Sequence, residues 1–300
     1  MIALAHAAAG NHGQHEQTMQ VATDNANTMS WITMSDGCQL AVRDWPHARM
    51  RSAVLIVHGL GEHSGRYQRL AQWFHTRGYA VRSYDQRGHG QSEGQRGALD
   101  HPDDLLEDLA VVYNEYAMQL PQAPLLLGHS MGGLVAARCV LDRRITPPAL
   151  VLSSPALRCH EPVWLQKLAS LLAKVAPRLP LNNGLKLDKL SHDAQVVADY
   201  RIDPHCHRRI TPRMADFIFR AGASSIADAS RLNLPTLLLV SGPDGLVDSS
   251  GSRDFASAAW AGNHLTTRFF DTLYHELFNE AEPGRSQVLK QLGDWLQKLP

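Results

Sequence analysis

Residues 125–133 read LLLGHSMGG and set a serine between a predicted buried strand and a predicted helix, which is the most informative pattern in the chain. Three consecutive leucines are typical of a strand buried on both faces, and the apolar residues after Gly132 predict a helix. The pattern G-x-S-x-G permits a turn so sharp that a Cβ at either flanking glycine would clash. Such a turn raises the serine hydroxyl above the sheet, at a helix N-terminus that favours negative charge. Ser130 is therefore the candidate nucleophile rather than an ordinary helix N-cap.

Short apolar runs alternate with helical patterns on both sides of this stretch. An Asp36-Gly37 turn joining the strand-like runs 31–35 and 39–45 comes first and predicts a hairpin. The further predicted strands are 53–57, 79–84, 125–127, 150–152, 236–240 and 267–270, and the helices between and after them are 67–77, 103–120, 132–141, 253–260 and 286–299. This alternation predicts the α/β class, with a mostly parallel central sheet flanked by helices.

The alternation stops at residues 156–230, which carry helical patterns at Val163–Val175 and Arg213–Ala221 but no buried strand run. We interpret 156–230 as a helical cap or lid inserted into a core made of residues 30–155 and 231–300. The insertion falls between two sheet strands, and ligands of open α/β folds bind at the carboxyl edge of the sheet. The cap is therefore expected to cover a binding site.

Composition excludes several classes of protein. The 29 Lys and Arg residues balance 29 Asp and Glu residues at a pI of about 7.3, so a nucleic-acid partner is not expected. No apolar run approaches the roughly 20 residues that span a bilayer. Four cysteines without CxxC spacing indicate free thiols and favour a cytoplasmic location. Residues 1–29 are predicted to be a disordered leader, and a secretory signal is disfavoured because no Lys or Arg precedes the apolar run.

A serine hydroxyl needs a base to activate it, and the base needs an acid to orient it. With this type of nucleophile turn, the chain order is serine, acid, histidine. The turn after the strand 236–240 contains Asp244 and then Asp248. We favour Asp244, which comes first, and interpret Asp248 as the rival that could instead cap the following helix.

Only two of the sixteen histidines follow these acids, His264 and His275. His264 precedes the predicted strand 267–270 and therefore lies at the opposite edge of the sheet from Ser130. His275 follows that strand, so it shares the edge with Ser130 and is the candidate base.

An oxyanion would need a second N–H donor beside the helix that starts at Met131. The predicted strand 53–57 runs into a glycine-rich loop, where Gly59 allows a tight turn and the N–H of Leu60 can point at the site. His205 and His207 have a spacing that some metal sites use, but no partner cluster is evident, so no metal is predicted.

Five motifs together resemble the α/β-hydrolase superfamily, and within it the monoacylglycerol lipase and lysophospholipase group of serine aminopeptidase S33-like hydrolases. They are HGLGEHSGRY at 58–67, DQRGHGQSEG at 85–94, GHSMGG at 128–133, DGLVDS at 244–249 and YHEL at 274–277, and the likeness covers residues 30–300. The resemblance implies a triad of Ser130, Asp244 and His275, with oxyanion N–H groups from Leu60 and Met131. It also implies hydrolysis of carboxylic esters of glycerol or lysophospholipids without a cofactor.

Monoacylglycerol lipase is the favoured function, with lysophospholipase or a broad carboxylesterase as alternatives. Acyl transfer to an acceptor other than water stays open, as do the acyl length, the head group and the oligomeric state. A non-catalytic receptor or scaffold would require a broken triad position. The loop 85–94 is expected to brace the oxyanion segment rather than to bind phosphate, because it lacks the P-loop Lys-Ser/Thr.

The cap leaves its own alternatives open. Val163–Val175 has a broad apolar face, which would suit a lid that admits acyl chains or touches a membrane, or else a helix packed on the cap's own core. Residues 156–230 hold eleven Lys and Arg against seven Asp and Glu. This small positive excess favours peripheral contact with an anionic lipid surface. No protein partner is implied.

Overall fold

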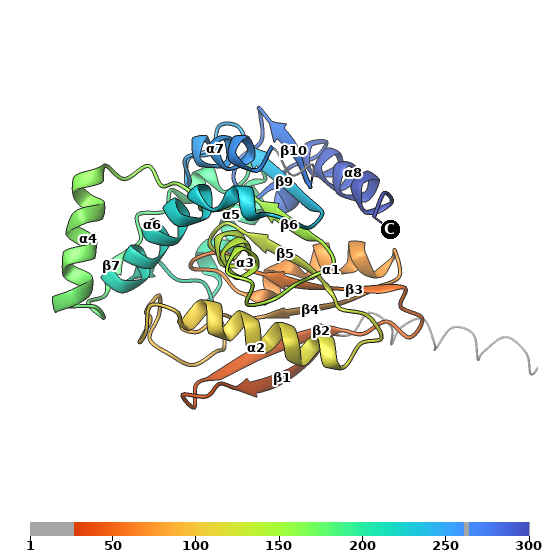
Figure 1. The fold of residues 1–300 in the computed structure, drawn as a ribbon, viewed down its shortest axis with the longest axis horizontal. Coiled ribbons are helices and arrows are strands. Elements are labelled where there is room, and N and C mark those ends of the chain that lie inside the picture. Colours follow the sequence, from red (N-terminus) through yellow and green to blue (C-terminus); the bar gives the residue numbers. More distant parts are fainter. Residues whose placement is uncertain (1–26, 261–263, 300) are drawn as a thin grey trace, which may run out of the picture.

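An eight-stranded sheet with helices on both faces forms the body of the protein (Figure 1). The structure, a computed structural model, describes residues 27–260 and 264–299. The strands are β1 (Thr28–Thr33), β2 (Gln39–Trp45), β3 (Ser52–Val57), β4 (Tyr79–Tyr84), β5 (Leu125–His129), β6 (Leu150–Ser153), β9 (Thr236–Ser241) and β10 (Leu265–Phe270). Their order across the sheet is β1-β2-β4-β3-β5-β6-β9-β10. All pairs from β4 to β10 are parallel, and β2 runs antiparallel to both β1 and β4. The predicted, mostly parallel sheet is confirmed.

The central strands are buried along their whole length and mostly apolar, because both of their faces are covered. In β5, Leu126 joins one hydrophobic cluster, whereas Leu125 and Leu127 join the cluster on the opposite face. Successive side chains of a strand point to opposite faces, so a continuous apolar run is what a doubly covered strand requires. Four helices cover the first face, α2 (Asp104–Met118), α3 (Met131–Leu141), α6 (Pro212–Ala227) and α7 (Ser250–Ala259), and two cover the second, α1 (Gln68–His75) and α8 (Gly284–Leu296).

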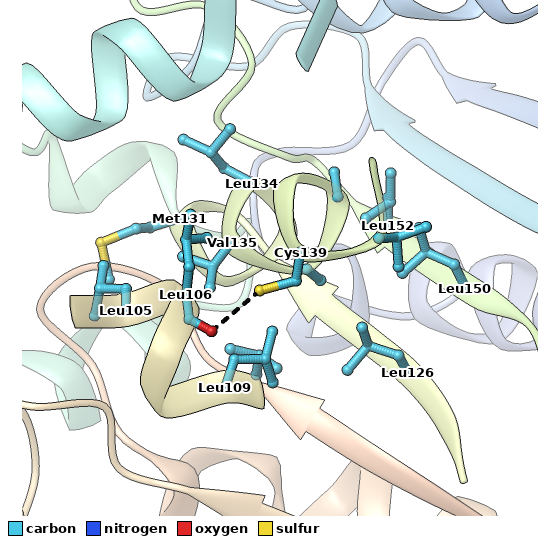
Figure 2. Close-up of a cluster of buried hydrophobic side chains, with 14 of the residues drawn as sticks. Leu105, Leu106, Leu109, Leu126, Met131, Leu134, Val135, Cys139, Leu150 and Leu152 are labelled. Carbon is cyan, nitrogen blue, oxygen red and sulfur yellow. Dashed lines mark hydrogen bonds between the residues drawn. The ribbon is translucent and has the colours of Figure 1, made fainter. Parts of the chain in front are cut away.

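Helix α3 is the most deeply buried of these helices, since all of its residues are buried. Figure 2 shows its side chains among leucines of α2, β5 and β6. The thiol of Cys139 donates a hydrogen bond of 3.4 Å to the carbonyl oxygen of Leu106. All four cysteines, Cys38, Cys139, Cys159 and Cys206, are free thiols, as the sequence predicts.

The insertion at 156–230 contains α4 (Val163–Val175), α5 (Ala194–Ile202) and α6, together with a short antiparallel pair, β7 (Leu181–Asn182) and β8 (Arg209–Ile210). Helix α4 contacts α6 at the left edge of Figure 1 and has no buried residue. Helix α6 in turn packs on α3, where Met214 and Phe217 join the main core. The insertion is therefore continuous with the core through α6.

Strand β1 corrects the expected boundary of the leader, because it begins at Thr28 rather than after residue 29. Thr28 pairs with Asp44 of β2, and the side chain of Asn27 bonds both Arg43 and Gln68. Pairing with β2 and these side-chain bonds bring residues 27–29 into the fold, although their own sequence is polar. The remainder of the expected leader, residues 1–26, lies outside the described residues.

The parallel register brings the carboxyl ends of the central strands to one edge. Val57 at the end of β3 pairs with Tyr84 and Gly128, while Ser153 pairs with His129 and Leu239. The loops that follow β3, β5, β9 and β10 therefore emerge side by side at this edge.

We expect Leu126→Ala to lower the free energy of unfolding by about 2–5 kcal/mol, because it removes a fully buried side chain from the central strand and leaves a cavity. Urea unfolding followed by circular dichroism measures the change. Met118→Ala is the control, since Met118 is 81% exposed at the end of α2 and should change stability by less than about 0.5 kcal/mol. Equal losses in the two variants would contradict the assigned core.

Candidate active site

Ser130 occupies a strained turn between β5 and α3. Its backbone has φ 53° and ψ −121°, in a region that non-glycine residues rarely adopt. The turn is possible because glycines flank it: a Cβ on Gly128 would lie 2.4 Å from the carbonyl oxygen of Gly132, and a Cβ on Gly132 would lie 2.3 Å from that of His58. Strain of this kind persists only where the surroundings enforce it, and it is concentrated at functional sites.

Asp244 lies on the turn that follows β9, with a buried carboxylate. Its Oδ1 accepts hydrogen bonds from the N–H groups of Leu246 and Val247 at 2.9 and 3.0 Å, and its Oδ2 lies 2.7 Å from Nδ1 of His275. Burial raises the pKa of Asp244, but the charge of His275 and the backbone donors outweigh burial, so the pKa lies below its ordinary value. Asp244 is therefore ionised at neutral pH.

His275 follows β10 and is buried. Burial lowers the pKa of this imidazole, but the charge and hydrogen bond of Asp244 outweigh it and hold the pKa above its ordinary value. An ionised Asp244 can only accept, so Nδ1 of His275 donates and Nε2 is left as the proton acceptor. The 2.7 Å contact thus selects the tautomer that a general base needs.

The rival residues are placed elsewhere. Asp248 lies just before α7, and its Oδ1 accepts a hydrogen bond of 2.9 Å from the N–H of Ser250, the first residue of that helix, whose N-cap is Ser249. His264 is exposed, and its carbonyl accepts from the N–H of Thr236 at the amino end of β9. It therefore lies at the opposite edge of the sheet from His275.

One pocket brings the candidate residues together. It has a volume of about 350 Å³, and Leu60, Ser130, Met131 and His275 all line it. Most of its remaining wall is apolar and comes from the cap and from the loop after β9: Leu165, Ala169, Leu181, Leu185, Leu190, Ile210, Ala215, Ile218, Phe219, Leu246 and Val247. A mostly apolar cavity with a few convergent polar groups is the usual form of a small-molecule site.

A buried carboxylate holds the loop that carries Leu60. Oε1 of Glu62 accepts from the N–H of Gly59 at 2.6 Å and from the hydroxyl of Tyr67 at 2.8 Å. Burial raises the pKa of Glu62, but Arg66 outweighs burial and lowers the pKa to about 2. This fixed charge orients the backbone directly before Leu60.

Arg66 joins this loop to the histidine loop. Its guanidinium bonds Glu62 at 2.7 Å and Glu276, the residue after His275, at 2.7 and 2.8 Å. The sequence motifs contain these residues, but no role was assigned to them. Arg66 and Glu276 are 210 positions apart, so no local pattern reveals that they pair.

His129, next to Ser130, was also given no role by the sequence. Its ring centroid lies 4.8 Å from that of His275. Burial and the neighbouring His275 lower the pKa of His129 to about 4, so it is neutral at pH 7. A neutral ring here spares His275 the repulsion of a second cation.

The loop at 85–94 braces the oxyanion segment, as expected. Oδ1 of Asp85 accepts from the N–H of Ser64 at 2.8 Å, and the side chain of Gln86 donates to the carbonyl oxygen of His58 at 2.6 Å. The N–H of Gln86 also donates to Nε2 of His58 at 2.9 Å.

A cluster at the cap contact holds groups of metal-ligating type. His63, Asp203 and Cys206 bring ligand atoms within 4.8 Å of one another, and neither His205 nor His207 belongs to the cluster. Nδ1 of His63 accepts from the N–H of Gly65, so its Nε2 carries the hydrogen and donates to Asp203 at 2.8 Å. A metal at Nε2 would have to displace this hydrogen, so the arrangement fits a hydrogen-bonded contact better than a metal centre.

The chain is similar to known hydrolases over most of its length. The family model described as "Serine aminopeptidase, S33" matches residues 48–282. A monoacylglycerol lipase of Mycolicibacterium smegmatis is 34% identical, covering 87% of this chain and 93% of its own. Phospholipase YtpA of Bacillus subtilis is 30% identical, covering 82% of this chain and 95% of its own.

A solved structure shows the same fold. The crystal structure of a monoacylglycerol lipase from Paleococcus ferrophilus superposes with a TM-score of 0.78 at 32% identity, covering 88% of this chain and 99% of its own. The family match spans most of the chain, and the relatives align over nearly their whole length. The chain therefore belongs to the serine aminopeptidase S33 family, as an ester hydrolase of the α/β-hydrolase monoacylglycerol lipase group.

Proposed function

We propose that the protein hydrolyses monoacylglycerols through an acyl-enzyme on Ser130. The observation that carries this proposal is the buried Asp244–His275 pair at 2.7 Å, whose His275 lines the same apolar pocket as Ser130 on its strained turn. The names of the relatives support the substrate class, since they include lipases that act on monoacylglycerols.

The mechanism follows from the roles that these groups can take. Nε2 of His275 removes the proton of Ser130 as its Oγ attacks the ester carbonyl, and Asp244 stabilises the imidazolium that forms. The N–H groups of Leu60 and Met131 hold the oxyanion, and each such donor contributes about 2.7–4 kcal/mol to the transition state. His275 then gives its proton to the departing alcohol, and water attacks the acyl-enzyme in the same way.

The pocket suits an ester with one acyl chain. Its apolar walls can bury a hydrocarbon chain. The carboxylates of Glu62 and Glu276 line the same cavity and offer polar contacts to the alcohol part of the ester. A volume of about 350 Å³ leaves little room for three chains at once. A lysophospholipid also has one acyl chain, and the phospholipase among the relatives supports it as the alternative substrate.

Helix α4 supports a peripheral contact with lipid. Val163, Trp164, Leu171 and Val175 are 58–71% exposed on its outer side. Its residues Leu165 and Ala169 line the pocket, so this apolar surface continues into the cavity. Both sequence interpretations of the helix thus find support, because it packs on α6 and also presents apolar side chains to solvent. Among the described residues, no helix is long and apolar enough to cross a bilayer.

The purified protein should release fatty acid faster from a long-chain monoacylglycerol than from the triacylglycerol of the same chain, because the capped pocket admits one chain. Ser130→Ala should abolish this hydrolysis and the labelling by a fluorophosphonate. Fatty-acid titration and gel fluorescence measure the two effects. Hydrolysis retained by Ser130→Ala would place the nucleophile elsewhere, and equal rates on the two lipids would contradict a restricted pocket.

Asp244→Asn should lower kcat by roughly 10⁴-fold, because an amide at this position can select the wrong tautomer of His275. Asp248→Asn is the matched control and should leave kcat within about two-fold, since this side chain bonds the N–H of Ser250 at the start of α7. Neutral His275 is the active form, and Asp244 raises its pKa, so kcat/KM of the native enzyme should rise with pH through a midpoint above 6.5. In Asp244→Asn the residual activity should have a lower midpoint. An unshifted midpoint would contradict the role of Asp244.

Trp164→Glu should weaken binding to vesicles of phosphatidylglycerol roughly ten-fold or more, because it replaces a large apolar side chain on the proposed lipid-facing side. Hydrolysis of the soluble ester p-nitrophenyl butyrate should not change. Trp260→Glu is the matched control, because Trp260 is also highly exposed but lies at the end of α7, outside the cap. Vesicle sedimentation measures binding, and equal weakening in both variants would speak against α4 as the contact.

A further inference from the structure

The carbonyl group of Gly61, in the loop that carries Leu60, accepts two hydrogen bonds from the cap. The hydroxyl of Tyr200, at the end of α5, donates to the carbonyl oxygen of Gly61 at 2.9 Å. The backbone N–H of His207 donates to the same oxygen, also at 2.9 Å. A carbonyl oxygen has two lone pairs, so the cap segment 200–207 supplies both of its hydrogen bonds.

Further contacts attach the same loop to the same cap segment. The imidazole of His63 donates to Asp203 at 2.8 Å. The guanidinium of Arg66 lies over the ring of Tyr200, 4.9 Å from its centroid. The cap segment 200–207 therefore contacts core residues 61–66 through a carboxylate, an aromatic ring and the backbone.

No space separates the two segments at Gly61. This glycine has φ +78°, and a Cβ on it would lie 2.5 Å from the carbonyl oxygen of His207 and 2.8 Å from the hydroxyl oxygen of Tyr200. The loop can approach the cap this closely only because position 61 has no side chain. Any shift of the cap segment therefore changes the position of the Gly61 carbonyl.

Leu60 is held from both sides as a result. On one side, Glu62 binds the N–H of Gly59 at 2.6 Å. On the other side, the cap binds the carbonyl of Gly61. The core also holds the peptide group that carries the N–H of Leu60, because Nδ1 of His58 donates to the carbonyl oxygen of Gly59 at 2.7 Å. The contact on the far side of Leu60, at the Gly61 carbonyl, comes from the cap.

We propose that Tyr200 is a positioning residue for the oxyanion hole, and that the cap segment 200–207 holds the N–H of Leu60 where the oxyanion forms. The cap then completes the catalytic apparatus as well as covering the substrate. This inference rests on the proposed ester hydrolysis. It assigns the Tyr200 hydroxyl to the protein backbone, whereas its place on the pocket wall would equally allow a contact with the alcohol part of the substrate.

Tyr200→Phe separates these two roles, because it keeps the ring over Arg66 and removes only the hydroxyl. We expect kcat and kcat/KM to fall together by roughly ten-fold, with KM changed less than about two-fold. The loss is smaller than the 10²–10³-fold expected for a missing oxyanion donor, because the N–H of His207 still holds Gly61. The factor should be the same for p-nitrophenyl butyrate, which has no glycerol, and for a monoacylglycerol.

A transition-state analogue provides a second measurement. The Oγ of Ser130 adds to the carbonyl carbon of a trifluoromethyl ketone with an alkyl chain, the hydroxyl proton passes to Nε2 of His275, and the carbonyl oxygen becomes an oxyanion. Its inhibition constant should rise by the same factor by which kcat/KM falls. The affinity for the product fatty acid, which forms no oxyanion, should change less than about two-fold.

Tyr113→Phe is the matched control for losing a buried tyrosine hydroxyl. Tyr113 donates to the carbonyl oxygen of Pro124 at 3.0 Å, just before the amino end of β5, whereas Ser130 follows the carboxyl end of that strand. This variant should lower the melting temperature but leave kcat unchanged. Asp203 provides an independent pair: Asp203→Ala should lower kcat in the same manner as Tyr200→Phe, whereas Asp203→Asn should retain activity because its amide oxygen can still accept from His63.

A Tyr200→Phe variant with unchanged kcat on both esters would overturn the inference while leaving ester hydrolysis intact. A rise in KM confined to the monoacylglycerol would also overturn it, in favour of a substrate contact. By contrast, a wild-type protein without esterase activity, or an active Ser130→Ala variant, would overturn the proposed function itself. If Tyr200→Phe does not fold, the two Asp203 variants decide the outcome by the same measurements.

Discussion

The close approach of two backbone segments beneath Ser130, the start of α3 and the end of β3, holds the whole site together. A Cβ on Gly132 would lie 2.3 Å from the carbonyl oxygens of both Val57 and His58, so α3 begins in contact with the end of β3. This contact brings the N-terminus of α3 and the loop after β3 to the same point. A hydrogen bond would be too weak to enforce the strained backbone of Ser130, but packing of backbone against backbone can do so, because neither side has room to relax.

The buried charges of Glu62, Arg66 and Glu276 hold two loops of the site at a fixed distance from each other. Arg66 connects Glu62 with Glu276 and so fixes the distance between the loop of Leu60 and the loop of His275. Buried ion pairs add little to stability, because desolvation offsets most of their attraction, but they permit only one arrangement. An apolar replacement could pack as well and would still leave the two loops without a fixed relation. The main effect of this network is therefore to fix the relative position of the two loops rather than to add to the free energy of unfolding.

Much of the fold follows from local sequence rules. The leucines of β5 and the apolar residues of β3 predict strands buried on both faces. Gly128 and Gly132 predict the sharp turn that connects β5 to α3. Chain order and the direction of parallel strands are enough to select His275 over His264. The start of β1 was not predicted, because Thr28 adopts a strand conformation through pairing with β2 and its own sequence does not indicate a strand. Helix α5 also escaped, since its few apolar residues face a small cluster within the cap.

The order of the elements, the nucleophile turn and a short list of acids and bases can be derived from the sequence, because they depend on the residue types of near neighbours. The contacts that hold the site residues in their relative positions become visible only in the folded protein. Tyr200 meets Gly61 across 139 positions and Arg66 meets Glu276 across 210, and each contact is set by the packing of whole elements. Hydrogen bonds and ion pairs act over a few ångströms in space regardless of separation along the chain, so a pattern that is local in sequence cannot encode them.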